Sequence, residues 1–86
     1  MISSVITVTT SPTLLVAATA TATRTIYLEP VDADVHIGGP AVTTTTGLIT
    51  KKDVISVMVL PPQNALYGVT GTGTVTIRLL QPEGDF

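Results

Sequence analysis

The sequence contains no cysteine and no tryptophan, and it has few charged or aromatic residues. Without cysteine, neither a disulfide nor a thiolate metal site can form. One phenylalanine and two tyrosines are too few to build stacking platforms for bases or sugars. The net charge is −2, and Lys51-Lys52 is the single basic pair. Phosphate binding needs clustered Lys and Arg, so we expect no nucleic-acid partner.

Long hydrophobic runs are also missing. The longest apolar stretch, Leu14–Ala22, is interrupted by Thr19 and Thr21 and falls far short of the ~20 residues that a membrane helix needs. The first residues, Met1–Val5, lack the basic region of a secretory signal. We therefore expect no membrane partner, and synthesis in a cytoplasm.

The low charge content bears on the surface of the protein. Charged residues make up 12% of the chain, about half of the usual ~25%. The mean hydropathy is +0.53, and Thr43–Thr46 is an unbroken threonine run. A free monomer normally carries more charge to resist association, and a domain of 86 residues is near the lower limit of self-sufficient stability. These features favour a homo-oligomer, or a protein covered by neighbours. The alternative is a neutral, threonine-coated monomer.

A period of two runs through almost the whole chain and predicts short β-strands. The predicted strands cover residues 5–9, 13–17, 24–29, 34–37, 47–50, 54–60, 66–69 and 74–80. We therefore predict an all-β fold: a compact antiparallel β-sandwich of seven or eight short strands with little or no helix, for which the jelly roll is one candidate topology. Residues 1–86 form a single domain. Within it, residues 1–23 are edge strands or an N-terminal arm, and residues 81–86 are an extended tail.

Three local features sharpen this prediction. Pro30 lacks a ladder donor, so the strand that starts at Arg24 is expected to end at Glu29-Pro30. The segment Val54–Leu60 is apolar on both faces, which is typical of a central or doubly covered strand. The glycines in Thr70–Gly73 indicate a hairpin connection.

The search for catalytic or binding chemistry favours no enzyme class. Asp34, His36 and Ser56 could be assembled on paper into a catalytic triad, but a surface histidine near an acid is the better interpretation. Asp32 and Asp34 lack the further carboxylates of a calcium loop, so they are interpreted as turn residues. We predict no catalytic residue, no cofactor and no metal site.

The chain resembles a group of small β-rich virion proteins of tailed bacteriophages. The resemblance lies in Arg24–Pro30, Asp34–Gly47, Leu60–Val69 and Gly73–Arg78, and it extends over roughly residues 24–80. The recurrent pattern is a strand, an Asp-Val-x-Ile/Val-Gly-Gly step with a Val-Thr-Thr segment, a Leu-Pro-Pro step and Ala-Leu-Tyr-x-Val.

This chain departs from that pattern at two places. His36 stands where an aromatic residue is more usual, and Glu29-Pro30 where a small polar residue is common. These departures leave the expected fold intact, but they weaken the transfer of any specific contact.

The resemblance implies a structural virion protein, most plausibly a minor capsid or decoration protein. Such a protein binds the major capsid protein on the outer surface of the head and reinforces the shell, commonly as a trimer. The turns that would face the shell supply the candidate interface residues: Asp32, Asp34, His36, Gly38, Gly39, Pro61, Pro62, Gln63 and Asn64. Two alternatives remain: a tail, baseplate or fibre-associated module, and a carbohydrate-binding β-sandwich.

Overall fold

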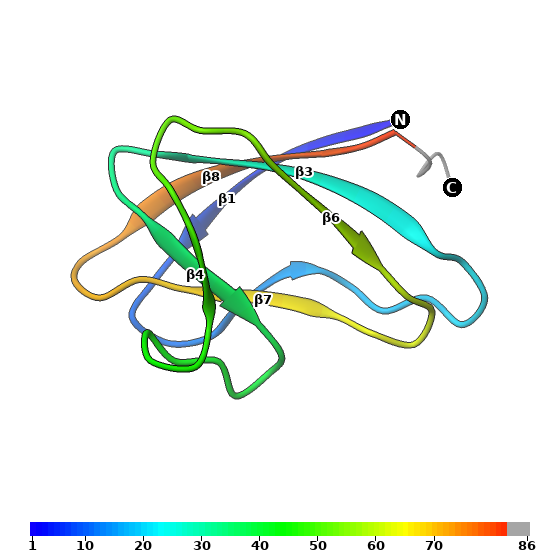
Figure 1. Cartoon of the computed structure of the whole chain (residues 1–86), viewed down its shortest axis with the longest axis horizontal. Coiled ribbons are helices and arrows are strands. Elements are labelled where there is room, and N and C mark those ends of the chain that lie inside the picture. Colours follow the sequence, from blue (N-terminus) through cyan, green and yellow to red (C-terminus); the bar gives the residue numbers. More distant parts are fainter. Residues whose placement is uncertain (83–86) are drawn as a thin grey trace.

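The computed structural model describes residues 1–82, and in that range it contains eight β-strands and no helix (Figure 1). The strands are β1 (Ile2–Val8), β2 (Thr13–Val16), β3 (Arg24–Val31), β4 (Val35–Gly38), β5 (Leu48–Thr50), β6 (Ser56–Leu60), β7 (Leu66–Val69) and β8 (Val75–Gln81). Gln81 ends β8 and is buried, so the predicted extended tail begins one residue later at the earliest. The rest of that prediction, residues 83–86, lies outside the described residues.

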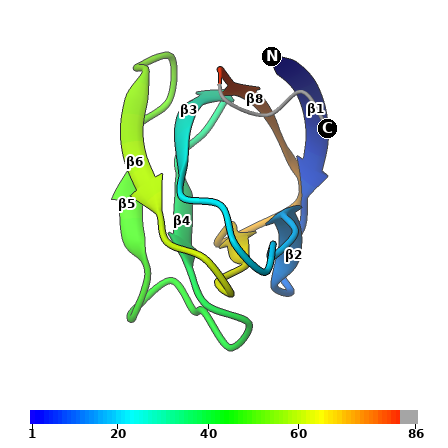
Figure 2. The same ribbon diagram turned by 90° about the vertical axis from the view of Figure 1, so that its right-hand side faces the viewer.

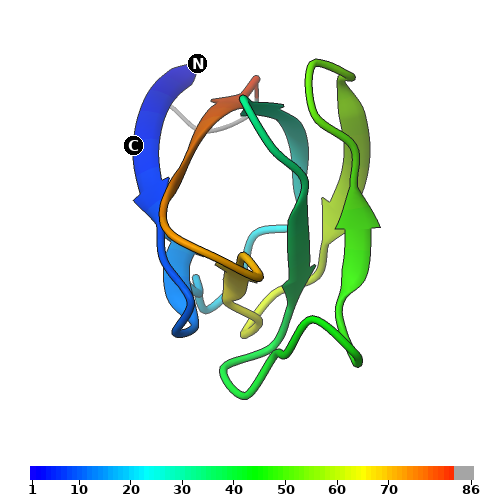
Figure 3. The same ribbon diagram turned by 90° about the vertical axis from the view of Figure 1, so that its left-hand side faces the viewer.

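The strands form two four-stranded antiparallel sheets that face each other (Figures 2 and 3). Sheet A has the order β1-β8-β3-β6, and sheet B has the order β2-β7-β4-β5. The first strand pairs with the eighth and the second with the seventh, while the third pairs with the sixth and the fourth with the fifth. The chain is thus one long antiparallel hairpin wrapped into two sheets, which is the jelly-roll topology. The predicted all-β sandwich is confirmed.

The alternation of side chains in each strand produces the core. In β3 every second residue is buried, including Ile26 and Leu28 with no exposed surface. Strand β8 contributes Ile77, which is also completely buried, and β4 contributes Val35 from the opposite sheet. Val35 and Ile37 share the inner face of β4, and His36 lies on the outer one. Period-two patterning therefore determined which residues are inside.

The prediction that β3 ends at Pro30 is wrong, because β3 continues to Val31 and Pro30 pairs with Ile77 of β8. Strand β6 accompanies β3 no further than Leu28. At Pro30, the side of β3 that faces away from β8 therefore has no neighbouring strand that needs a hydrogen-bond donor. Proline can occupy this position although it lacks an N–H. The Pro30 carbonyl accepts a hydrogen bond from the Asp53 N–H at 2.8 Å.

Two further predictions are corrected by the topology. The apolar segment Val54–Leu60 is not a central strand, because β6 is the last strand of sheet A and the side chains of Val57 and Val59 are more than half exposed. The segment Thr70–Gly73 is not a hairpin, since it carries the chain from β7 in sheet B to β8 in sheet A. Both errors have one cause: periodicity records which residues are apolar but carries no information about which strands become neighbours.

Residues 39–47, between β4 and β5, form a loop that packs against the outer side of β4. The threonine run forms its own hydrogen-bonded turn, in which the Thr43 hydroxyl accepts the Thr46 N–H at 3.1 Å and the Gly47 N–H bonds to the Thr43 carbonyl at 2.8 Å. Val42, in this loop, is buried against Gly38 and Gly47. The outer face of sheet B is thus partly covered by the chain itself.

Candidate functional site: the outer face of sheet A

Within residues 1–82, no loop comparable with residues 39–47 covers the outer face of sheet A. Cross-strand register places its side chains in rows. One row joins Val5, Arg78 and Glu29. The next joins Ser3, Leu80, Tyr27 and Val57. The centre of this face is therefore apolar, with one pair of opposite charges beside it.

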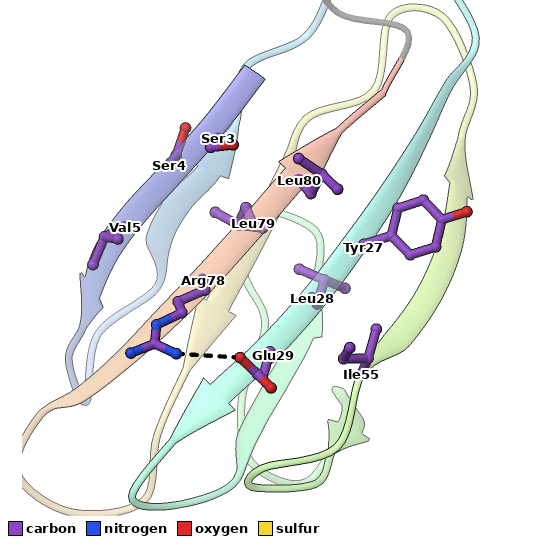
Figure 4. A pocket seen from close by; sticks show the side chains of 10 residues that line it. All are labelled: Ser3, Ser4, Val5, Tyr27, Leu28, Glu29, Ile55, Arg78, Leu79 and Leu80. Atoms are coloured by element: carbon purple, nitrogen blue, oxygen red, sulfur yellow. Dashed lines mark ion pairs between the residues drawn. The ribbon is translucent and has the colours of Figure 1, made fainter. Parts of the chain in front are cut away.

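A shallow hollow of about 420 Å³ lies on this face (Figure 4). Its lining comes from β1, β3 and β8, together with Ile55 just before β6. Figure 4 shows Arg78 and Glu29 as neighbours, with 3.5 Å between the Arg78 Nη1 and the Glu29 Oε1. The Arg78 side chain is 64% exposed, so this ion pair contributes little to stability. Its main effect is to leave the hollow without net charge.

The exposed apolar side chains give this face its chemical character. Val5 is 68% exposed at one edge, and Val57 is 57% exposed at the other. Half-buried Tyr27 and Leu80 lie between them. Apolar surface of this kind, bordered by a few polar groups, is typical of sites that bind another macromolecule. The sequence analysis did not identify this face, because β1, β3, β6 and β8 become neighbours only through the sheet topology.

The nine predicted interface residues are divided between the two ends of the sandwich. Asp32 and Asp34 lie in the connection from β3 to β4, and residues 61–64 form the turn from β6 to β7 at the other end (Figure 1). Gly38 and Gly39 lie at the end of β4 away from Asp34. The structure therefore does not bring all nine together, and their contact with a partner stays a prediction.

Many of these residues have structural partners within the chain. The Asp34 Oδ1 accepts the Lys52 N–H at 2.7 Å, and its Oδ2 lies 3.8 Å from the Lys51 Nζ. This carboxylate thus joins the β3–β4 and β5–β6 connections. Asp32 has a φ of 80°, a left-handed conformation that aspartate tolerates better than most residues.

The turn after β6 is tied to the connection between β2 and β3. The Gln63 N–H donates to the Thr19 carbonyl at 2.7 Å, and the Asn64 Nδ2 donates to the Pro62 carbonyl at 2.9 Å. Arg24 is 2% exposed, and its guanidinium donates to the Ala17 carbonyl at 2.6 Å and to the Asn64 carbonyl at 3.2 Å. A buried arginine that binds main-chain oxygens fixes the loops at this end of the sandwich.

The three residues considered for a triad are not assembled into one. Ser56 belongs to sheet A, whereas His36 belongs to sheet B. The His36 Nδ1 is buried without a hydrogen-bond partner, so it does not bond to Asp34.

Within residues 1–82 there is also no group of three or more His, Cys, Asp or Glu side chains that could hold a metal ion. No helix in the same part of the chain is long and apolar enough to cross a membrane.

Comparison of the chain with models of known protein families, with curated proteins and with solved structures found no match.

Proposed function

We propose that this protein is a structural component of a virion, and specifically a decoration protein that binds the outer surface of a tailed-phage head and stabilises the shell. The observation that carries the proposal is the bare, largely uncharged outer face of sheet A. A partner that covers Val5, Tyr27 and Leu80 would remove this apolar surface from water. The resemblance of residues 24–80 to small phage virion proteins supplies the identity of the partner, the major capsid protein.

The mechanism is passive. Each copy buries surface against the shell, and the binding free energy adds to the stability of the assembled state because the protein binds that state alone. Low charge suits this role, since few ionic groups have to be stripped of water when the contact forms. The Arg78–Glu29 pair lies in one row with Val5, so a partner that covers Val5 would cover the pair as well, and the two charges would then stay paired with each other.

The first experiment locates the protein. Heads and tails are separated from purified particles, and mass spectrometry measures the protein in each fraction. Recovery with heads supports the decoration role. Recovery with tails alone would contradict it and would favour the tail, baseplate or fibre-associated module.

The second experiment tests the surface. Shells assembled from the major capsid protein without this chain are mixed with purified wild type, with Val5→Lys or with Leu14→Lys, and sedimented. Val5 lies on the outer face of sheet A, and Leu14 is an exposed residue of β2 in sheet B. We expect Val5→Lys to weaken binding at least about tenfold, because an ammonium group would be buried in an apolar contact. Equal binding by wild type and Val5→Lys would refute this placement.

A carbohydrate-binding function is a second candidate, favoured by one observation. The hollow on sheet A combines an aromatic ring, Tyr27, with the polar groups of Glu29 and Arg78, and jelly rolls also occur in lectins. Binding of a panel of soluble oligosaccharides, measured by calorimetry, distinguishes the two functions. Tyr27→Ala should abolish any such binding.

A further inference from the structure

The exposed apolar side chains of the described residues are concentrated on one side of the sandwich. Nine large hydrophobic residues in this part of the chain are exposed, and six of them belong to β5, β6 or the connection between these strands. The six are Leu48, Ile49, Val54, Ile55, Val57 and Val59, with exposed fractions from 49% to 75%. Figures 2 and 3 show that β5 and β6 lie together at one edge of the two sheets, away from β1 and β2. We call these six residues and their strands the β5–β6 edge.

Strand β6 also presents an open ladder, because it is the last strand of sheet A and none of the described residues pairs with its outer side. Proteins usually protect such edges with charge, proline, a bulge or very short length. The edges of sheet B follow that rule: β2 has a register irregularity between Leu14 and Val16, and β5 has three residues followed by Lys51-Lys52. Strand β6 has no charge, proline or bulge within its five residues, and its nearest prolines, Pro61 and Pro62, follow the strand.

The other edge of sheet A differs from β6. On β1 the outward side chains of Ser3 and Thr7 carry hydroxyls, and Val5 lies opposite Arg78, whose side chain is 64% exposed. Water can therefore form hydrogen bonds with the main-chain groups and hydroxyls along the β1 edge. On β6 the outward side chains are Val57 and Val59, and no residue from 54 to 77 is charged. Strand β6 is therefore the edge that most favours a second strand.

We propose that β6 pairs antiparallel with β6 of a second copy of this chain, about a two-fold axis at Met58. Full overlap of the two five-residue strands places Met58 opposite Met58, and Val57 opposite Val59, of the other copy. Every position then meets an uncharged partner. Sheet A of one copy and sheet A of the other then join into one eight-stranded sheet. The unpaired main-chain groups of the two β6 edges form hydrogen bonds with each other.

The exposed area of the β5–β6 edge is large enough to permit a dimer. The exposed fractions of the six residues correspond to at most roughly 600 Å² in each copy, so two copies would bury up to about 1,200 Å² in all, the lower end of the range for stable interfaces. The nearest charges do not oppose the contact. Lys51 is drawn to Asp34 of its own chain, and the two-fold axis places the two Lys51-Lys52 turns at opposite ends of the paired strands.

This contact joins only two copies. Each copy uses its β6 edge for the other, so no free β6 edge is left to bind a third copy. It therefore predicts a dimer. The trimer implied by the virion resemblance would need a head-to-tail contact between different edges. The inference does not depend on shell binding, and it is tested on the isolated protein.

The experiment measures mass in solution by sedimentation equilibrium over a range of protein concentrations. The wild type should have about twice the chain mass of 8.9 kDa. The double variant Val57→Lys/Val59→Lys should be monomeric, with a dissociation constant raised at least tenfold. Both side chains are mostly exposed, so the fold should persist, which circular dichroism verifies. Val5→Lys, on the opposite edge of the same sheet, is the matched control and should remain dimeric.

A cross-linking experiment gives an independent result if the double variant does not fold. Because the chain has no cysteine, Val57→Cys introduces a unique thiol on a mostly exposed side chain. A short bis-maleimide should link two copies of Val57→Cys much faster than two copies of Val5→Cys. A wild type that is monomeric at all concentrations, a trimer, or dissociation by Val5→Lys in place of the β6 variant would overturn the proposal. So would equal cross-linking of the two cysteine variants.

Discussion

Gly47 offers a direct test of the loop that folds over sheet B. An alanine Cβ at this position would lie 2.8 Å from the His36 Cβ, 2.8 Å from the Val42 Cγ2 and 3.0 Å from the Thr43 carbonyl oxygen. Ordinary contacts of a Cβ are 3.4–4 Å. One of the three atoms belongs to the main chain and cannot move without the turn. We therefore expect Gly47→Ala to displace the loop from β4.

The cost can be worked from these contacts. Overpacking of a well-filled site costs about 1–3 kcal/mol. Movement of Thr43 would also weaken the hydrogen bond from the Gly47 N–H to the Thr43 carbonyl, now 2.8 Å long, which contributes about 0.5–1.5 kcal/mol. We expect a loss of about 1.5–4.5 kcal/mol in the free energy of unfolding. A domain of this length has roughly 4–13 kcal/mol in total, so the effect should be large.

The assay is urea unfolding followed by circular dichroism, with Gly39→Ala as the matched control. A Cβ at Gly39 would meet nothing within 4 Å, although the residue belongs to the same loop. Its replacement should leave stability unchanged or raise it by up to about 1 kcal/mol, since alanine restricts the unfolded chain more than glycine does. If Gly47→Ala is as stable as the wild type, or if both variants lose the same free energy, the loop does not lie against β4 as described.

Two further predictions concern the core and a strained turn. Ile77→Ala should lower the free energy of unfolding by about 2–5 kcal/mol and Ile77→Val by about 0.5–1.5 kcal/mol, because Ile77 is completely buried; a loss below about 1 kcal/mol for the alanine variant in urea unfolding would contradict the packing. Gln63 has a φ of 65°, which strains residues with a Cβ, so Gln63→Gly should raise the melting temperature, equivalent to about 0.5–1 kcal/mol after glycine's entropy cost. Gln63→Ala, with the strain retained, should show no such gain in calorimetry.

Much of the fold was readable from local patterns. Alternation predicted a strand at residues 34–37, which puts Val35 and Ile37 on one face and His36 on the other, and the strands around Ile26, Ile77 and Leu66 were placed within a few residues. The gap between the predicted strands 47–50 and 54–60 coincides with the turn at Lys52-Asp53. These features depend on residues close in the sequence, so a single sequence contains the information that determines them.

The candidate site was not readable in this way. The sequence analysis selected turns rich in glycine, proline and aspartate, whereas the structure shows an apolar face assembled from β1, β3, β6 and β8. Tyr27 and Leu80 are 53 positions apart in the sequence and become neighbours only through the β3–β8 ladder. Periodicity shows that a side chain points away from the core, but not which other side chains will lie beside it.

The sequence by itself determined the class of the fold, the inward-facing residues and the scarcity of charge, because each depends on the identity of a residue or its near neighbours. Tertiary structure alone decided that β6 is an edge strand and that a loop partly covers the outer face of sheet B, while the described residues leave the outer face of sheet A exposed. The physical reason is that pairing between distant strands depends on how the whole chain closes its two sheets. The same apolar segment would be buried at the centre of a sheet and is exposed at its border.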